Sequence, residues 1–276
     1  MIRITALMDN KGSEHLALIH EHGLSYYIEY NGTRLLFDCG SGSHSQDNAH
    51  RLGIDLKDLD AVVLSHSHYD HAAGYRDLIE NGQGSKKLFI GDHFFEKKYA
   101  QAASRYTDLS AGFDEAFLRA HGIEQHVIAG HDEIFPGVHV VTAFPRVNAF
   151  ETIPERFVRL TPDGFVSDDF GDEVCLALQA SEGLIVLVGC AHPGILNMVQ
   201  HVQKLLKQPV IAVYGGTHLK EASDERIETT ISELKTLGVE TLGLSHCSGD
   251  NCEVLLHAHE EVTSLHLGTG DTVFHM

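Results

Sequence analysis

The sequence predicts an α/β fold in which strands and helices alternate along the chain. Short runs rich in Val, Ile and Leu are followed by turn residues and then by segments with helical periodicity. Several of these runs end in a histidine, which is unusual for connecting loops. Hydrophobic residues make up 43% of the 276 residues, so the chain has enough apolar side chains for a sizeable core.

The first part of the chain begins with strand-like segments. Asn31-Gly32 separates two of them, and Asn-Gly between apolar runs is a strong hairpin signal. The run Ala-Val-Val-Leu-Ser at residues 61–65 is continuously apolar and predicts a buried strand. In this part we expect strands at residues 2–8, 24–30, 33–38, 61–65 and 87–90, and helices at residues 48–53 and 70–81.

Residues 93–122 are rich in aromatic and charged side chains and show partial helical periodicity. We interpret them as an inserted helical segment, either near the mouth of a site or packed at the side of the fold. No internal repeat, low-complexity tract or long linker is visible. We therefore expect residues 1–276 to form one domain with a helical insertion at about 93–122.

The second part repeats a strand–loop–helix pattern three times, and each strand ends near a histidine: His192, His218 and His246. That edge of an α/β sheet is where ligands commonly bind. Ser223 is positioned to cap a helix. We expect strands at residues 138–143, 174–179, 184–189, 209–214 and 240–245, and helices at residues 195–207 and 223–237.

Charge and composition restrict the partners. The 39 acidic and 20 basic residues give a formal charge of -19, which disfavours nucleic acid and anionic membranes. No apolar run approaches the roughly 20 residues of a spanning helix, and no secretory signal is visible. Five cysteines, an odd number, indicate free thiols in a reducing compartment. We expect a cytoplasmic protein with a small-molecule substrate; its oligomeric state stays open.

The stretch His66-Ser67-His68-Tyr69-Asp70-His71 places four potential metal ligands directly after a buried strand. Alternate residues of such a turn face one cavity, so His66 and His68 suit one ion. Asp70 and His71, at the start of the next helix, suit a second. Imidazole and carboxylate ligands fit zinc, iron or manganese, and zinc is the first choice.

This stretch resembles the HxHxDH signature of the metallo-β-lactamase superfamily. Leu35–Gly40 and Ser245-His246 resemble its strand-Asp-x-Gly element and its late strand-end histidine. The resemblance implies an αββα sandwich of two mixed β-sheets flanked by helices. Further segments resemble the dihydropteroate-synthase-like branch, whose archaeal members condense a dihydropterin with ribofuranosylaminobenzene 5′-phosphate. These segments are Glu21–Ser25, Ser65–His71, Gly189–Ile195, Gly215–Leu219 and His246–Gly249.

The resemblance implies two divalent metal ions, with His192 completing the first site and His246 completing the second. One departure from the family pattern affects the expected number of metal ions. Most members have a bridging aspartate at the end of the strand that here reads Leu187-Val188-Gly189-Cys190, and no Asp or Glu stands there. The separate histidine usual near residues 142–148 is also missing, so His192 is expected to replace one of the two groups.

Several other residues are weaker candidates for a role in the site. Asp38, at a strand end, is expected to orient a ligand histidine, or else to cap a turn. His218 is a candidate for substrate contact or proton donation, with a structural role equally open. Tyr69, Arg146 and Ser248 are candidate substrate residues, as is Glu151 more weakly; Arg146 would suit a phosphate or carboxylate.

Three functions follow from this site. The leading one is hydrolysis of an ester, amide or phosphoester by a metal-activated water, with Asp70 and His218 as catalytic residues. The second is a transferase that joins a dihydropterin pyrophosphate to an aromatic amine or to ribofuranosylaminobenzene phosphate. The third is a non-enzymatic, metal-dependent sensor. Neither a G-x-S-x-G nucleophile elbow nor a P-loop occurs in the sequence.

Overall fold

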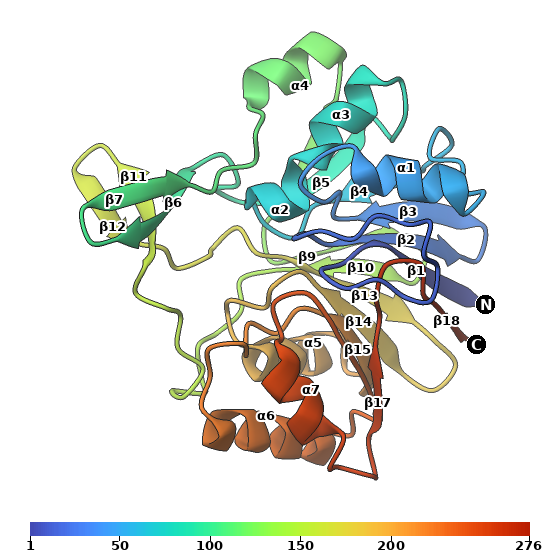
Figure 1. Cartoon of the computed structure of the whole chain (residues 1–276), viewed down its shortest axis with the longest axis vertical. Coiled ribbons are helices and arrows are strands. Elements are labelled where there is room, and N and C mark those ends of the chain that lie inside the picture. The colour runs from blue at the N-terminus through green and yellow to red at the C-terminus, as the bar shows by residue number, and fades with distance from the viewer.

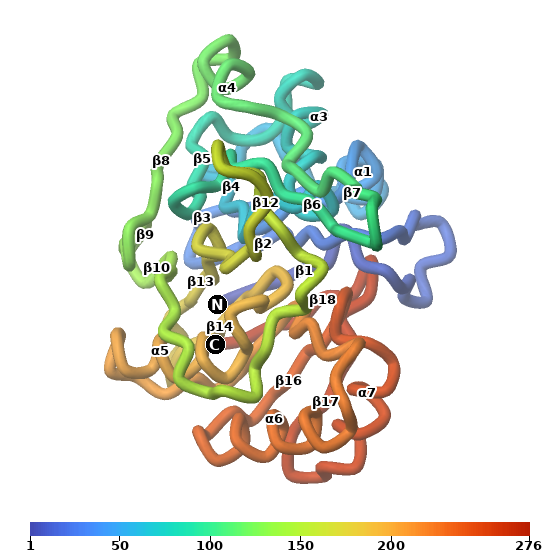
Figure 2. Tube along the Cα trace, turned by 90° about the vertical axis from the view of Figure 1, so that its left-hand side faces the viewer, coloured from blue at the N-terminus to red at the C-terminus, as the bar shows by residue number.

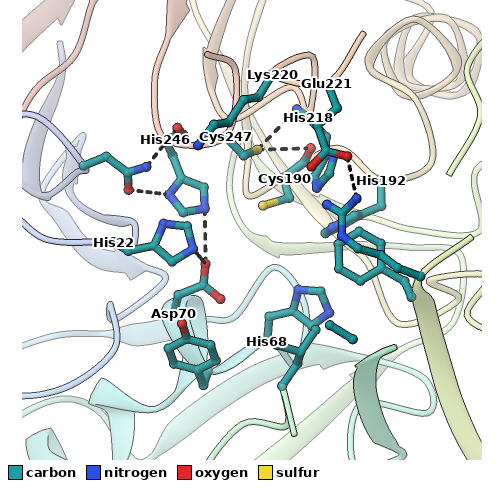
Figure 3. A pocket seen from close by; sticks show the side chains of 16 residues that line it. His22, His68, Asp70, Cys190, His192, His218, Lys220, Glu221, His246 and Cys247 are labelled. Carbon is teal, nitrogen blue, oxygen red and sulfur yellow. Dashed lines mark hydrogen bonds and ion pairs between the residues drawn. The ribbon is translucent and has the colours of Figure 1, made fainter. Parts of the chain in front are cut away.

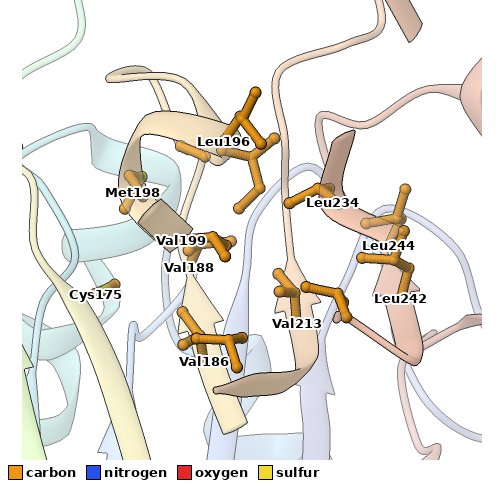
Figure 4. Close-up of a cluster of buried hydrophobic side chains, with 14 of the residues drawn as sticks. Cys175, Val186, Val188, Leu196, Met198, Val199, Val213, Leu234, Leu242 and Leu244 are labelled. Carbon is orange, nitrogen blue, oxygen red and sulfur yellow. The ribbon is translucent and has the colours of Figure 1, made fainter. Parts of the chain in front are cut away.

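Three clusters of buried apolar side chains divide the protein into four layers. The computed structural model describes residues 1–276. Ile4, Phe37, Leu176 and Leu187 belong to the cluster between two seven-stranded sheets. A second cluster joins one sheet to helices α5, α6 and α7 (Figure 4). A third joins the other sheet to α1, α3 and α4, on the opposite side of the molecule (Figure 1). The layers therefore run helix–sheet–sheet–helix, which confirms the predicted fold class.

The first sheet contains both ends of the chain. Its strand order is β18-β1-β2-β3-β4-β5-β8, with β1 antiparallel to both β2 and β18 and with β3, β4, β5 and β8 parallel. The predicted Asn31-Gly32 turn connects β2 to β3. The strands are β1 Ile2–Met8, β2 Ser25–Tyr30, β3 Thr33–Phe37, β4 Ala61–Val63, β5 Lys87–Gly91, β8 Glu124–Ile128 and β18 Thr272–His275.

The second sheet is built mainly from the later part of the chain. Its order is β17-β16-β15-β14-β13-β10-β9, and β14 to β17 run parallel. Their carboxyl ends meet at one edge, where the predicted histidines stand. The strands are β9 His131–Phe135, β10 Val138–Val141, β13 Cys175–Gln179, β14 Leu184–Val188, β15 Val210–Gly215, β16 Thr241–Leu244 and β17 Thr263–His266.

Seven helices accompany the sheets. Ser223 caps α6, because its side chain accepts a hydrogen bond from the Arg226 N–H at 3.3 Å, as predicted. No helix combines the length and the apolar character that crossing a bilayer requires. The helices are α1 His44–Arg51, α2 Tyr69–Ala72, α3 Gly74–Glu80, α4 Glu115–His121, α5 Ile195–Leu206, α6 Asp224–Thr236 and α7 Asp250–Leu256.

A small third sheet corrects the expected helical insertion at residues 93–122. Its order is β12-β11-β6-β7, and only α4 in this region is helical. Tyr99, Tyr106 and Phe165 contact one another across its strands, the Tyr106 and Phe165 rings stacked at 4.0 Å. Aromatic residues favour such cross-strand pairs over a helix. The strands are β6 Lys97–Ala102, β7 Arg105–Asp108, β11 Phe157–Thr161 and β12 Gly164–Ser167.

The third sheet joins segments that lie far apart in the sequence. Strand β6 pairs antiparallel with β11, which follows the whole β8–β10 segment. Figure 2 shows the long connection that leaves β10, passes α5 and then reaches this sheet. The sheet projects from one side of the sandwich (Figure 1). It places Ala100 and Phe157 beside the carboxyl-edge pocket described next.

Candidate metal centre

A pocket of about 280 Å³ lies where strands of both large sheets end (Figure 3). Its wall includes His68 and Asp70 from the predicted metal stretch, together with His192, His218 and His246 from three separate strand ends. Segments far apart in the sequence thus meet at one place.

His66, His68 and His192 form the first donor group, with one ligand atom of each within 4.8 Å of the others. The exposed fractions of these residues are 0%, 5% and 5%. Burial lowers the pKa of all three imidazoles well below the usual value, so the rings are neutral. The buried Nε2 atoms of His66 and His68 have no hydrogen-bond partner. Neutral nitrogen atoms that face one point without partners are what a bound cation requires.

Outer hydrogen bonds fix the rings of this group. The Ser65 hydroxyl donates its single hydrogen to Asp38 Oδ2 at 2.7 Å, so it accepts from His66 Nδ1 at 2.9 Å. His192 Nδ1 donates to Glu173 Oε2 at 2.8 Å. With both Nδ1 atoms occupied, each ring presents Nε2 as the free donor atom.

Asp70, His71 and His246 form the second donor group. His246 Nε2 lies 3.3 Å from Asp70 Oδ2 and 3.1 Å from His71 Nε2. His71 Nδ1 donates to Asp38 Oδ2 at 2.7 Å, and His246 Nδ1 donates to Asn10 Oδ1 at 2.9 Å. These two rings therefore also present Nε2 to the pocket.

Charges keep Asp70 and His71 ionised in the absence of metal. Burial favours the neutral form of Asp70. The charge of His71 and the hydrogen bond from His22 outweigh it, and they hold the pKa of Asp70 well below its usual range. Burial opposes the charge on His71, but Asp38 and Asp70 raise its pKa to about 9.

Asp38 links the two donor groups. It is fully buried, accepts hydrogen bonds from the Ser65 N–H and hydroxyl at 2.7 Å each, and accepts a third from His71. This is the geometry expected of a residue that orients ligand histidines. Asp38 at φ 59°, His218 at 51° and His246 at 53° all have left-handed backbone, which is uncommon for non-glycine residues.

Sequence reasoning missed two residues beside these groups. His22 lies 3.1 Å from Asp70 Oδ2 and stacks on His246 with ring centroids 4.9 Å apart. Cys190 places its Sγ 3.2 Å from His71 Nε2. His22 belongs to the segment Glu21–Ser25 that carries part of the family resemblance, which is the signal that could have identified it.

The weaker candidate residues form two groups, those that line the pocket and those that lie outside it. His218 and Tyr69 line the pocket, and the His218 ring lies 4.8 Å from that of His192. Burial and the charge of Arg156 lower the pKa of His218 to about 4, so its ring is neutral near neutral pH. This favours a neutral hydrogen-bonding role over proton donation by an imidazolium.

Three candidate substrate residues lie outside the pocket. Arg146 donates to the backbone carbonyl oxygens of His192 and Asp169, and so supports the loop behind the site. Ser248 is fully buried, and its hydroxyl contacts Thr217. Both side chains are engaged by the protein itself, so their expected substrate contacts stay predictions.

Glu151 is also engaged elsewhere. Its carboxylate accepts hydrogen bonds from the Leu196 and Asn197 N–H groups at 2.9 and 2.8 Å, at the start of α5. It serves as a helix cap and does not face the pocket.

Arg156 and Lys220 bring positive charge to the pocket. The Arg156 guanidinium lies 4.5 Å from the centroid of the Phe157 ring and pairs with Glu221. Neither cation belongs to a motif, and Arg156 precedes a strand of the unpredicted third sheet, so no sequence signal indicated it.

The comparisons with known proteins agree with this site. A family model described as the metallo-beta-lactamase superfamily matches residues 20–106. The 7,8-dihydropterin-6-methyl-4-(β-D-ribofuranosyl)-aminobenzene-5′-phosphate synthase of Methanocaldococcus jannaschii is 30% identical over 97% of this chain and 95% of its own. An uncharacterised protein of the same organism is also 30% identical, over 90% of this chain and 91% of its own.

Solved structures similar to this one also have the metallo-β-lactamase fold. Tm1679, described as a metal-dependent hydrolase of the β-lactamase superfamily, has 27% identity and a TM-score of 0.85, with 99% of each chain covered. Zinc-bound PqqB from Methylobacterium extorquens shares the fold, with 13% identity, a TM-score of 0.60 and 99% of each chain covered. On this evidence of sequence, fold and site, the chain belongs to the metallo-β-lactamase superfamily.

Proposed function

We propose that this protein is a metal-dependent hydrolase that acts on an ester, amide or phosphoester bond of a small molecule. The observation that carries the proposal is the set of buried, oriented imidazoles around one pocket, two of which have Nε2 atoms without any partner. Protein atoms alone leave these nitrogens unsatisfied, and a divalent cation satisfies them.

The donor groups fit two ions. His66, His68 and His192 would hold one, and Asp70, His71 and His246 would hold the other. Bound divalent ions supply Lewis-acid chemistry: they polarise a substrate oxygen and lower the pKa of water. Zinc is the first choice for a set dominated by imidazole, and iron and manganese are the alternatives.

The remaining pocket residues act on the substrate. Neutral His218 is placed to form a hydrogen bond to a substrate atom, and Phe157 gives the pocket an apolar wall. Arg156 and Lys220 attract negative charge, which supports a phosphoester or another anionic substrate. The two cations stand beside the carboxylates of Asp70 and Glu221 in the pocket lining, and Arg156 pairs with Glu221.

A pterin transferase is the second candidate, and the full-length similarity to the archaeal synthase favours it. The same donor groups would hold ions that stabilise a departing pyrophosphate. Arg156 and Lys220 would suit the phosphate of a ribofuranosylaminobenzene partner equally well.

Metal content and activity of variants test the proposed centre. His192→Ala and His246→Ala should each lose bound metal and at least ~100-fold of the hydrolytic rate, because each removes a ligand. His50→Ala, at an exposed position in α1, is the matched control and should keep both. Full metal content with full activity in either ligand variant would refute the proposal.

Substrate assays separate the two candidates. Chromogenic phosphodiesters, carboxylic esters and lactones test hydrolysis by the metal-loaded protein. A dihydropterin pyrophosphate supplied with an aromatic amine tests the transferase, because only a transferase forms the coupled product. Coupled product together with no hydrolysis of any panel member would replace the leading function by the second.

A further inference from the structure

Three charged side chains line the metal pocket without belonging to either donor group. Arg156 directly precedes β11, and Lys220 and Glu221 belong to the loop between β15 and α6. Figure 3 shows Lys220 and Glu221 together on the wall opposite His68. This part of the pocket therefore carries charge that the metal centre does not use.

The ion pair between Arg156 and Glu221 is open to solvent. The two side chains are 36% and 52% exposed, and the guanidinium donates to Glu221 Oε2 through Nη1 alone. Exposed ion pairs are weak, because water and salt screen both charges. Lys220, the residue before Glu221, is also exposed. An anion that enters the pocket can therefore compete with Glu221 for the guanidinium.

Phe157 holds the guanidinium in place independently of Glu221. The Arg156 Cζ atom lies 4.5 Å from the centroid of the Phe157 ring, which gives a cation–π attraction. The Phe157 ring is buried, and its centroid lies 5.5 Å from those of His68 and His192 in the first donor group. An aromatic ring thus mediates the contact between Arg156 and the ligand histidines. An anion bound by Arg156 is therefore a different group from the one that contacts the metals.

We propose that Arg156 and Lys220 bind a second anionic group of the substrate, a phosphate monoester or a carboxylate that takes no part in the reaction. Glu221 occupies this place in the unliganded protein, and the substrate anion displaces it. The planar guanidinium suits either anion, because its N–H groups can bind two oxygen atoms at once. This inference rests on the proposed function. It narrows the substrate to a molecule that carries negative charge apart from the bond that is cleaved.

Thiols with a charged or a neutral end test this site on the zinc-loaded protein. Mercaptohexanoate and mercaptohexanol share the thiol that binds zinc and differ in charge at the other end, and mercaptopropanoate and mercaptopropanol repeat the comparison at a shorter reach. Calorimetric titration gives each Kd without any turnover. The wild-type protein should bind at least one acid about tenfold more tightly than its alcohol. A phosphonate in place of the carboxylate shows which of the two anions the site prefers.

Substitutions assign this preference to named side chains. Arg156→Met should reduce the ratio of the alcohol Kd to the acid Kd by about fivefold or more, because it removes charge-assisted hydrogen bonds. Lys220→Met should reduce the ratio by a smaller factor. Glu221→Gln should increase it by about two- to fivefold, because the competing charge is gone. Arg119→Met, which removes an exposed arginine paired within α4, is the matched control and should leave the ratio unchanged.

The outcomes separate this inference from the proposed function. Zinc-loaded protein that binds the acids no more tightly than the alcohols, or an unchanged ratio in Arg156→Met, would overturn the anion site and leave the proposed hydrolase intact. An unchanged ratio in Glu221→Gln would overturn the displacement of Glu221. A protein that does not bind zinc at all would overturn the proposed function as well. Added salt should weaken binding of the acids and not of the alcohols, which a preference due to apolar packing would not show.

Discussion

Removal of the Lys98 ammonium should destabilise the fold more than removal of any surface ion pair. Lys98 is 2% exposed and lies between two buried carboxylates, Asp168 and Asp172. Its Nζ is 3.3 Å from Asp168 Oδ2 and 4.6 Å from the centroid of the Phe170 ring. Asp172 also accepts a hydrogen bond from the Ser67 N–H at 3.0 Å, within the metal-ligand stretch.

Lys98→Met keeps most of the side-chain volume but leaves two buried carboxylates without their cation. The loss of one partner from a buried charge pair typically costs about 3–5 kcal/mol. For a chain of this size, roughly 2 °C of Tm per kcal/mol gives a decrease of about 6–10 °C. Urea unfolding followed by circular dichroism, with thermal scans beside it, measures both quantities.

Two further variants make this test specific. Arg119→Met removes an exposed ion pair to Glu115 within α4 and should change stability by less than about 0.5 kcal/mol. Lys98→Met combined with Asp168→Asn and Asp172→Asn removes the uncompensated charges and should recover part of the loss. A loss below about 1 kcal/mol in Lys98→Met alone would refute the reasoning.

Three other outcomes follow from the structure. Chelation should lower Tm and abolish hydrolysis together, and re-added zinc should restore both, as calorimetry and rate assays would measure. The pKa of His266 is raised, because Asp9 and Glu253 raise it by more than burial lowers it. The resulting stabilisation is fully present below pH 6.5 and is lost as the pH rises through the raised pKa, and denaturant titrations should find this slope absent in His266→Asn. Gly91→Ala brings a Cβ within 2.0 Å of a backbone oxygen and should cost about 1–3 kcal/mol by urea unfolding, whereas Gly171→Ala, with 3.7 Å of space, should not.

Much of the sandwich could be predicted because its signals are local. The Asn31-Gly32 turn fixes the β2–β3 hairpin, and an apolar run ending in His192 or His246 marks a buried strand and its carboxyl end. The third sheet could not be predicted in this way. Strand β6 finds its partner β11 only after the chain has passed through β10, so the aromatic pattern at Tyr99 and Tyr106 looked helical when taken alone.

Prediction of the site from sequence is limited in the same way, to what local signals show. The stretch from His66 to His71 is contiguous, so its chemistry is visible without coordinates. Cys190 ends the strand where most members carry the bridging aspartate, but its position 3.2 Å from His71 Nε2 depends on two distant strand ends meeting. Arg146 was expected to suit a phosphate or carboxylate because of its residue type, and residue type does not indicate that its guanidinium contacts the backbone carbonyl oxygens of the loop behind the pocket.

The strained backbone around the pocket is explained by the histidine rings that the strained residues hold in place. Left-handed geometry at a non-glycine residue costs about 1–3 kcal/mol, and Asp38, His218 and His246 each adopt it at a strand end. Asp38 in that conformation accepts three hydrogen bonds, through which it fixes His71 directly and His66 through Ser65. One buried carboxylate thus orients a histidine of each donor group. The strain is therefore tied to alignment of the pocket, since a relaxed backbone at Asp38 would release both rings together.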